Sequence, residues 1–487
     1  MSSSIPVPPS RLRRPLWIAT AVVVVVLLAV GFVVVRDRLG RCDGMDDVRV
    51  NAAGECVGIS AGGSDFDQEA LSAVVERVRQ ANAEVEKGEY VSVAVFLPMT
   101  PSRTSIITPE WVVDQVEGAR LAQVRHNRSG VTPKVRLLLA NPGGDMAHWR
   151  EVVDEIDARR RTEDHLVAVT GIGLSLENAR QAIGRLTDAK IPVIASTITA
   201  DDIRFDGLLL PAPTNSRQAA AAAKQAKNFP DTSALMVVDT NREDLYPRTL
   251  ADAFTKQYED GQHVVVEQEQ QYDSLLGSVD NAFGQMMPNI CATGTGLVYF
   301  AGRGRDLVLL VAKLKDRACA DKPIRIFTGD DVTAAQLTAM DLRSNSMRNV
   351  EIYYTEVASS HAWVVDRDNP LEETRKFRSA AVEGFLGRPL VFDDIPSFDA
   401  GRIMGYDAVL TATSAIKGAA GKDGGLVDSA QVMQTVKLLN LENAVYGASG
   451  ELSYGNDGRA RHKVVPLMRV TAEGRSQYVA LDSEPTP

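Results

Sequence analysis

Small hydroxyl side chains come shortly after several apolar segments in the first half of the chain. Thr100, Ser175, Ser196 and Thr197 each follow a segment that has the pattern of a buried strand. In an open α/β sheet, ligands bind outside the carboxyl ends of the strands and close to helix N-termini. Hydroxyls combined with the free backbone N–H groups of a helix start suit a carboxylate. The alternative is that these hydroxyls only cap helices.

Strand ends in the second half of the chain carry a different set of groups. Tyr246 follows one predicted strand, Arg303 follows another, and the pair Asp330 and Asp331 follows a third. Carboxylates and an aromatic ring suit an ammonium group. The alternative is that these acids simply face water. Taken together, the two sets predict a site in which one half of the chain holds a carboxylate and the other half holds an amine.

Motifs for catalysis, for a metal or for a cofactor are weak in this chain. Residues 58–62 match the G-x-S-x-G nucleophile pattern around Ser60, but they lie between Cys56 and a later helix, without the strand-to-helix turn that the motif needs. Residues 167–175 resemble the start of a dinucleotide fingerprint, but Leu176 stands where the third glycine belongs. P-loop, H-E-x-x-H and EF-hand patterns are absent, and the six histidines are scattered. We therefore predict no catalytic residue, no metal site and no cofactor.

Alternating strand and helix patterns occupy most of the chain and would position these groups. The alternation runs from residue 90 to residue 228 and restarts at residue 234. Repeated units of this kind predict parallel sheets covered by helices on both faces, here in two Rossmann-like α/β lobes. The predicted strands are 90–97, 134–140, 166–170, 191–196, 234–239, 264–268, 296–300, 324–328, 444–454 and 463–471. The predicted helices are 65–87 with Asp65 as N-cap, 109–125, 146–161, 176–189, 216–228, 247–258, 278–287, 306–318, 370–386 and 405–418.

The N-terminal region has the pattern of a membrane anchor. Residues 16–35 are almost entirely apolar and follow three arginines, and about 20 such residues suffice for a helix to cross a bilayer. The arginines place residues 1–15 in the cytoplasm, so the bulk of the chain would be extracytoplasmic at the cell membrane. A cleaved signal peptide is the alternative, but its apolar region is usually shorter. Residues 36–64 are expected to form a stalk.

Composition and cysteine spacing restrict the function further. The 487 residues carry a net charge of −10 and lack a basic stretch interleaved with aromatics, which argues against a nucleic-acid partner. The four cysteines form two local pairs, Cys42 with Cys56 and Cys291 with Cys319. Disulfides at these pairs fit an extracytoplasmic location, although other pairings are open. A zinc site is the rival, but the chain has no C-x-x-C pair.

The order of segments resembles the type 1 periplasmic binding proteins of the Leu/Ile/Val-binding kind, the solute receptors of ATP-driven importers. The resemblance covers residues 90–470. The segments that carry it are VSVAVFLPMT at 91–100, GARLAQVRHN at 118–127, residues 168–175, IPVIAST at 191–197, VYFAG at 298–302, GYDA at 405–408 and VYGASGELSYGNDG at 445–458.

This resemblance implies roles for particular residues. The family's carboxylate contacts would fall on Ser175, Ser196 and Thr197, its aromatic contact on Tyr246, and its ammonium-binding acid on Asp330. Arg303 stands near a position where an aromatic often faces the ligand, and an arginine there could instead neutralise an acidic ligand.

The resemblance also implies an architecture and a set of partners. Three hinge crossings would divide the chain into a first lobe (65–213 and 357–440) and a second lobe (214–356 and 441–487). An amino acid or related acid would bind between the lobes, for transfer to the permease and ATPase subunits of an ABC importer. The alternative function is a membrane-tethered sensor that signals through a separate membrane partner.

Overall fold

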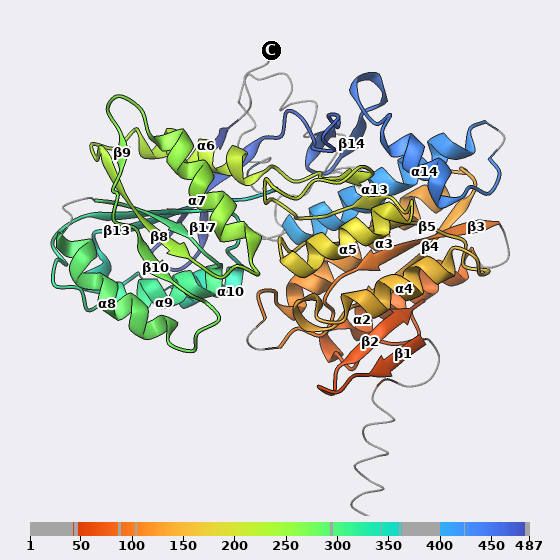
Figure 1. Ribbon diagram of the computed structural model, residues 1–487, viewed down its shortest axis with the longest axis horizontal. Helices are drawn as coiled ribbons and strands as arrows, with labels where there is room; N and C mark the ends of the chain where they lie inside the picture. The colour runs from red at the N-terminus through yellow and green to blue at the C-terminus, as the bar shows by residue number, and fades with distance from the viewer. Residues whose placement is uncertain are drawn as a thin grey trace, which may run out of the picture.

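The computed structural model describes residues 42, 47–85, 89–102, 105–292, 296–340, 342–359, 362, 400–422 and 424–482. The predicted tail, the predicted transmembrane helix 16–35 and the predicted helix 370–386 lie outside these residues and stay predictions. Among the described residues, no helix has both the length and the hydropathy that a membrane crossing requires. The described chain forms two α/β lobes that lie side by side (Figure 1), as the strand–helix alternation predicted.

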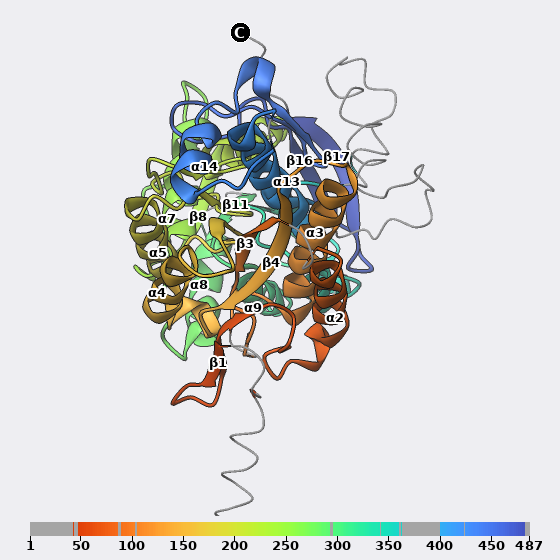
Figure 2. The same cartoon turned by 90° about the vertical axis from the view of Figure 1, so that its right-hand side faces the viewer.

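The first lobe is built on a mixed sheet whose described strands follow the order β1-β2-β4-β3-β5-β6-β7. Strands β4, β3, β5, β6 and β7 pair in parallel in this order, and a β1–β2 hairpin adds to β4 in antiparallel orientation. Helices α2 and α3 cover one face of this sheet and α4 and α5 cover the other (Figure 2), so the central strands are apolar on both faces. The strands are β1 (Asp47–Val50), β2 (Cys56–Ser60), β3 (Tyr90–Phe96), β4 (Lys134–Asn141), β5 (Leu166–Thr170), β6 (Val193–Ile194) and β7 (Leu208–Leu209). The helices are α2 (Glu69–Ala83), α3 (Pro109–Arg128), α4 (Trp149–Arg159), α5 (Glu177–Asp188), α13 (Ala400–Ala420) and α14 (Ser429–Val436).

The second lobe has a sheet of the order β10-β8-β11-β12-β13-β16-β17 in the described chain, with β9 also paired to β8. Strands β8 to β13 are parallel, and β16 and β17 join in antiparallel orientation. The strands are β8 (Ser233–Asp239), β9 (Val264–Val265), β10 (Gln270–Tyr272), β11 (Leu297–Ala301), β12 (Ile324–Thr328), β13 (Val350–Thr355), β16 (Val465–Val470) and β17 (Ser476–Asp482). The helices are α6 (Asn215–Ala226), α7 (Leu245–Tyr258), α8 (Val279–Ala292), α9 (Gly304–Leu314) and α10 (Ala334–Ala339).

The structure differs from the sequence prediction between residues 47 and 60, which were assigned to the stalk. They form β1 and β2, and β2 pairs with β4 through Gly58 opposite Asn141. The Asn141 side chain donates to the Cys56 carbonyl at 2.6 Å and accepts from the Met99 amide at 2.7 Å, which fixes the hairpin to the sheet. Ser60 is fully buried in β2, and its Oγ accepts the backbone N–H groups of residues 62 and 64, so it is a structural residue.

Helix α2 begins later than expected. Asp65 was predicted as its N-cap, but Phe66 and Asp67 have positive φ angles of 58°, so the chain turns before the helix starts at Glu69. The Asp65 carboxylate instead accepts the amide of Asp67 at 3.1 Å. A local side-chain hydrogen bond thus competes with helix initiation at this position.

Two glycines let α3 and α13 pack closely in the first lobe, although these helices are far apart in the sequence. A Cβ atom on Gly118 would lie 2.0 Å from the carbonyl oxygen of Arg402, and one on Gly405 would lie 2.3 Å from that of Gln115. The backbones could not approach this closely with any larger residue. This contact returns residues 400–420 to the first lobe, where the resemblance expected them.

Residues 445–454, which were assigned to the second lobe, also pack in the first. They form a hairpin of β14 (Val445–Gly447) and β15 (Gly450–Leu452), and Val445, Leu452 and Tyr454 join the first hydrophobic core. The chain enters the second sheet only with β16, because Asp407 on α13 holds the hairpin through the amides of Ala448 and Ser449. The predicted boundary at residue 441 is therefore too early, while the other predicted lobe boundaries stay predictions.

Both predicted disulfides are present, Cys42–Cys56 and Cys291–Cys319. The first ties residue 42 to the start of β2, the strand next to the edge strand β1. The second joins the end of α8 to the segment that follows α9.

Candidate functional site

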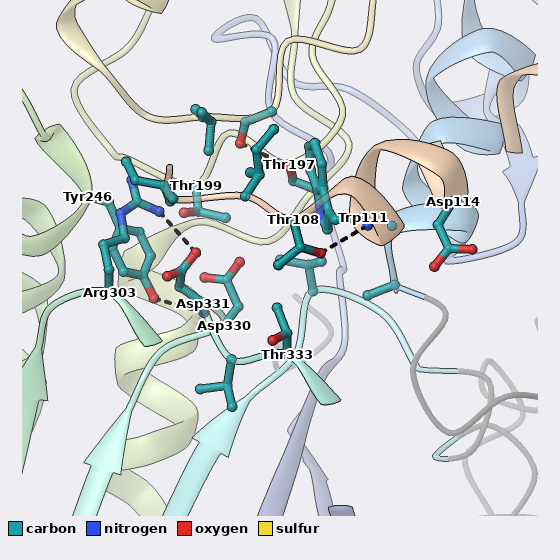
Figure 3. A pocket seen from close by; sticks show the side chains of 18 of the residues that line it. Thr108, Trp111, Asp114, Thr197, Thr199, Tyr246, Arg303, Asp330, Asp331 and Thr333 are labelled. Atoms are coloured by element: carbon teal, nitrogen blue, oxygen red, sulfur yellow. Dashed lines mark hydrogen bonds and ion pairs between the residues drawn. The ribbon is translucent and has the colours of Figure 1, made fainter. Parts of the chain in front are cut away.

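A cavity of about 420 Å³ lies between the lobes, at the carboxyl ends of parallel strands from both sheets. Its size falls in the range of small-molecule sites. The first lobe contributes the start of α3, the turn after β5 and the loop after β6, and the second lobe contributes the start of α7 and the ends of β11 and β12 (Figure 3). Its described lining includes Ile106, Ile107, Thr108, Trp111, Gly173, Leu174, Ser175, Thr197, Thr199, Tyr246, Arg303, Asp330, Asp331, Val332 and Thr333.

Five of the residues proposed from the sequence line this cavity: Ser175, Thr197, Tyr246, Arg303 and Asp330. The other two proposed residues are not among the lining residues. Thr100 is buried and accepts a hydrogen bond from the Asn141 side chain at 3.3 Å. Ser196 is fully buried and its Oγ donates to the Gly171 carbonyl at 2.9 Å. These two hydroxyls stabilise the turns that shape the cavity wall.

The hydroxyls at the first-lobe wall differ in what they can offer a ligand. Ser175 Oγ accepts the amides of Thr199 and Ala200, each at 3.3 Å, so its own hydrogen remains available to donate to a ligand oxygen. Thr197 Oγ1 donates to the Gly173 carbonyl at 2.9 Å and therefore presents lone pairs to the cavity. Of the proposed carboxylate contacts, Ser175 is thus the donor in this arrangement.

Arg303 is not free to neutralise an acidic ligand. Its Nε and Nη2 atoms donate to the two oxygens of Asp244 at 2.6 and 2.7 Å, and its Nη1 donates to Asp331 at 3.2 Å. Its guanidinium also stacks over the ring of Tyr246, 4.5 Å from the ring centroid. Burial opposes the charge of Arg303, but the two aspartates outweigh it and hold the pKa of Arg303 well above its ordinary value.

Asp330 presents a carboxylate oxygen with no counter-charge of its own. Its Oδ1 atom is buried and has no hydrogen-bond partner in the described part of the chain. Burial raises the pKa of Asp330 to about 6, and the neighbouring charge of Asp331 acts in the same direction. In Figure 3 the two carboxylates lie next to each other, beside Tyr246 and Arg303. A ligand ammonium group would supply the missing positive charge.

Trp111 was missed by the sequence analysis. It lies in the first turn of α3, which Thr108 caps by accepting the Trp111 amide at 3.3 Å. A Cβ atom on Gly173 would lie 2.7 Å from the tip of the Trp111 ring, so the glycine lets the ring approach the turn after β5 closely. With Ile106 and Leu174 it forms an apolar wall. The sequence did offer a signal for Trp111. It is an aromatic residue in the first turn of a capped helix, and that helix follows a strand whose end faces the ligand.

Replacing Asp330 with asparagine is expected to stabilise the ligand-free protein at neutral pH. A folded-state pKa of about 6, against an ordinary value of 3.8, means that the charged form costs up to about 3 kcal/mol of folding free energy. Because the folded pKa is raised, stability falls as pH rises from 4 to 6 and stays lower above that. Denaturant unfolding of Asp330→Asn should therefore show a gain of about 1–3 kcal/mol at pH 8 and little difference at pH 4. A loss of stability at pH 8 would contradict this prediction, because it would show that the charged carboxylate of Asp330 is stabilised by a partner in the folded protein.

Comparison with known proteins agrees with this geometry. A sequence model of the family described as periplasmic binding protein matches residues 114–475. No curated protein sequence matches the chain. Several solved structures have the same fold at low identity.

Three of these structures illustrate the range of these proteins. The branched-chain amino acid transporter substrate-binding protein LivJ from Streptococcus pneumoniae, in complex with isoleucine, is 16% identical with a TM-score of 0.59, over 81% of this chain and 99% of that one. The leucine-binding protein LivK from Thermotoga maritima is 19% identical with a TM-score of 0.58, over 80% and 98%. A solute-binding protein of an ABC transporter from Rhodopseudomonas palustris, in complex with p-hydroxybenzoic acid, is 16% identical with a TM-score of 0.57, over 81% and 97%.

Proposed function

The chain belongs to the periplasmic binding protein family, and on this premise we propose that it captures a small solute with an ammonium group, such as an amino acid, for an ABC-type importer. Like the proteins it resembles, it is a ligand-binding protein and not an enzyme. The lobes would enclose the solute, with Ser175 facing its carboxylate and Asp330 facing its amine. Closure would be stabilised by contacts that exist only when both lobes touch the solute.

The negative charge of the cavity wall is the observation that supports a ligand with an ammonium group. Among the described residues that line the cavity, Arg303 is the one basic side chain, and it is already paired with Asp244 and Asp331. Four acidic residues line the same cavity: Glu110, Asp114, Asp330 and Asp331. An acid without an amine, such as the p-hydroxybenzoic acid bound by one structural neighbour, would meet repulsion here. An ammonium group would be attracted.

A thermal-shift screen tests this proposal. The panel contains the L-amino acids together with benzoate and p-hydroxybenzoate, which lack an ammonium group. A ligand that binds only the folded protein raises its melting temperature by mass action. We expect a rise with at least one amino acid and none with the two aromatic acids. A rise with the aromatic acids alone would contradict the proposed ligand class.

The location and the partners are part of the same proposal. The protein would be anchored in the cell membrane by residues 16–35 with its lobes outside the cytoplasm, and both disulfides fit an oxidising compartment. Purification of the full chain from membranes distinguishes the two candidate functions, import and sensing. Copurifying permease and ATPase subunits would support import, whereas a signalling receptor in their place would support the sensor.

Binding of an amino acid is expected to weaken at acidic pH. The ammonium group of the amino acid stays protonated across this range, so the change comes from Asp330, whose pKa in the empty site is about 6. Below that value, protonation competes with binding and the dissociation constant should rise about tenfold per pH unit, while above pH 7 it should be constant.

Calorimetry of the strongest ligand from the screen at pH 5, 6 and 8 checks this dependence. The matched control is Asp330→Asn, in which the pH dependence should disappear. A constant affinity of the unmodified protein across this range would remove Asp330 from the contact.

A further inference from the structure

The two lobes are joined by backbone hydrogen bonds beside the cavity. The Leu245 amide of the second lobe donates to the Ser175 carbonyl, and the Glu177 amide of the first lobe donates to the Glu243 carbonyl, both at 2.9 Å. These bonds form an isolated antiparallel bridge between Leu176 and Asp244. Residues 175–177 and 243–245 thus meet as two short strand-like segments at the mouth of the cavity.

A side chain from the second lobe is also inserted into the first. Leu245 begins α7, yet its side chain is 6% exposed and belongs to the hydrophobic core of the first lobe. Opening the lobes would return this side chain to water and break both backbone hydrogen bonds. The closed arrangement therefore has stabilising contacts that involve no ligand atom.

The segment that carries Leu245 is held in place by Arg303. The guanidinium of Arg303 forms its two-pronged contact with Asp244, and Asp244 in turn accepts the Tyr246 amide at 3.1 Å as the N-cap of α7. Arg303 and Asp244 are 4% and 3% exposed. A bidentate pair of this kind fixes both the position and the orientation of a carboxylate. The turn that presents Leu245 to the first lobe therefore depends on Arg303, which lies just after the neighbouring strand β11.

We propose that Leu245 and the segment 243–245 form a latch that holds the lobes closed without ligand, and that Arg303 is the positioning residue of this latch rather than a ligand contact. Because Ser175 begins one of the two joined segments and Tyr246 directly follows the other, closing the latch also assembles the proposed binding site. This consequence for affinity rests on the proposed function, whereas the latch itself does not. The apparent affinity of a ligand that needs the closed form falls in proportion to the fraction of protein that is closed.

The distance between the lobes in the absence of any ligand tests the latch directly. All four cysteines of the chain are in disulfides, so new cysteines can carry spin labels without a background. Asp188→Cys on α5 and Lys256→Cys on α7 are exposed positions in different lobes. Double electron–electron resonance on the labelled full chain then reports the distribution of interlobe distances.

Two variants and one control use this readout. Leu245→Ala removes the inserted side chain and leaves every charged group in place. The double variant Asp244→Asn with Arg303→Gln removes both fully buried charges of the clamp together, and the other partner of Arg303, Asp331, keeps a side chain that is 22% exposed to water. Arg248→Ala is the control, because it removes an interlobe ion pair with Asp202 whose side chains are 57% and 37% exposed.

We expect both latch variants to move most of the population to longer distances, while the unmodified protein and Arg248→Ala keep the short distance. If Leu245→Ala leaves the distribution unchanged, or if the control opens the lobes as much as the latch variants do, the latch is wrong. Neither result depends on which solute binds. A failure of the latch is therefore distinguishable from a failure of the proposed function.

Discussion

Replacing Asp330 with alanine is expected to weaken the binding of an amino acid by about 2–5 kcal/mol, the cost of leaving a desolvated charge without its partner. In the closed cavity the ligand ammonium is removed from water, and Asp330 offers it a buried oxygen atom that has no partner among the described residues. The other nearby acids are less available. Asp331 is paired with Arg303 and accepts the Gly304 amide at 2.8 Å, and Asp244 is paired with Arg303 as well.

Calorimetric titration of the strongest ligand from the thermal-shift screen measures this loss. Glu110→Gln is the matched control, because Glu110 lines the same cavity and the substitution also removes one negative charge, but its side chain is exposed at the rim. The control should change affinity by less than about 1 kcal/mol, as expected for an exposed charge. Equal losses in the two variants would mean that the general negative charge of the cavity attracts the ligand, without a specific contact to Asp330.

Removal of the buried lysine Lys463 is expected to destabilise the fold by about 3–5 kcal/mol, because its partner Asp407 would remain as an uncompensated buried charge. Both side chains are almost completely buried, at 3% and 0% exposed. Lys463 donates to the carbonyl and hydroxyl oxygens of Ser449 at 2.9 and 2.5 Å, and the same hydroxyl donates to Asp407. Burial lowers the pKa of Lys463 to about 8, although Asp407 opposes that shift.

Denaturant unfolding of Lys463→Met, Asp407→Asn and the double variant tests this pair. Lys463→Met leaves the buried carboxylate of Asp407 without its cation, and Asp407→Asn leaves the buried Lys463 without its anion. The double variant should lose less stability than the sum of the two single losses, since the two groups share one network. Arg461→Met is the control for a nearby exposed ion pair, here with Asp457, and should cost less than about 1 kcal/mol. Additive losses in the double variant would contradict a coupled pair.

The sequence predicted the fold where local pattern and burial agree. The strands 166–170 and 324–328 were placed at their observed bounds, because both are short apolar runs between helices with clear polar faces. The first-sheet hairpin was missed because β1 and β2 are short and β2 contains Gly58. The hairpin joins the sheet only where β2 pairs with the distant strand β4, so the local sequence shows no clear strand periodicity. Similarly, β17 depends on β16 for its pairing rather than on its own sequence.

Several residues of the motifs behind the family resemblance contact one another within the first lobe. Gly118 and Gly405 come from different motifs, and together they allow the close crossing of α3 and α13. Asp407 from the second motif holds Ala448 and Ser449 from the third. Asn127 likewise bonds both backbone groups of Val135, each at 2.9 Å. These residues position the lobe and its strand ends without touching the ligand cavity.

The site itself was predictable only in part. The rule that ligands meet strand ends located Ser175, Thr197, Tyr246 and Asp330, because that rule depends on topology alone. It could not show that Ser196 faces the Gly171 carbonyl, since that depends on the turn conformation. It also could not show that Arg303 is paired with Asp244, since those residues come from different strand ends.

Hydrogen exchange of the full chain with its strongest ligand from the screen tests the central claim most directly, that a small solute is held between two lobes. Ligand contact and closure slow exchange in the backbone segments they stabilise. The account predicts simultaneous protection of peptides covering 172–177 of the first lobe and 244–247 and 328–334 of the second. Protection confined to one lobe, or located away from these segments, would contradict it.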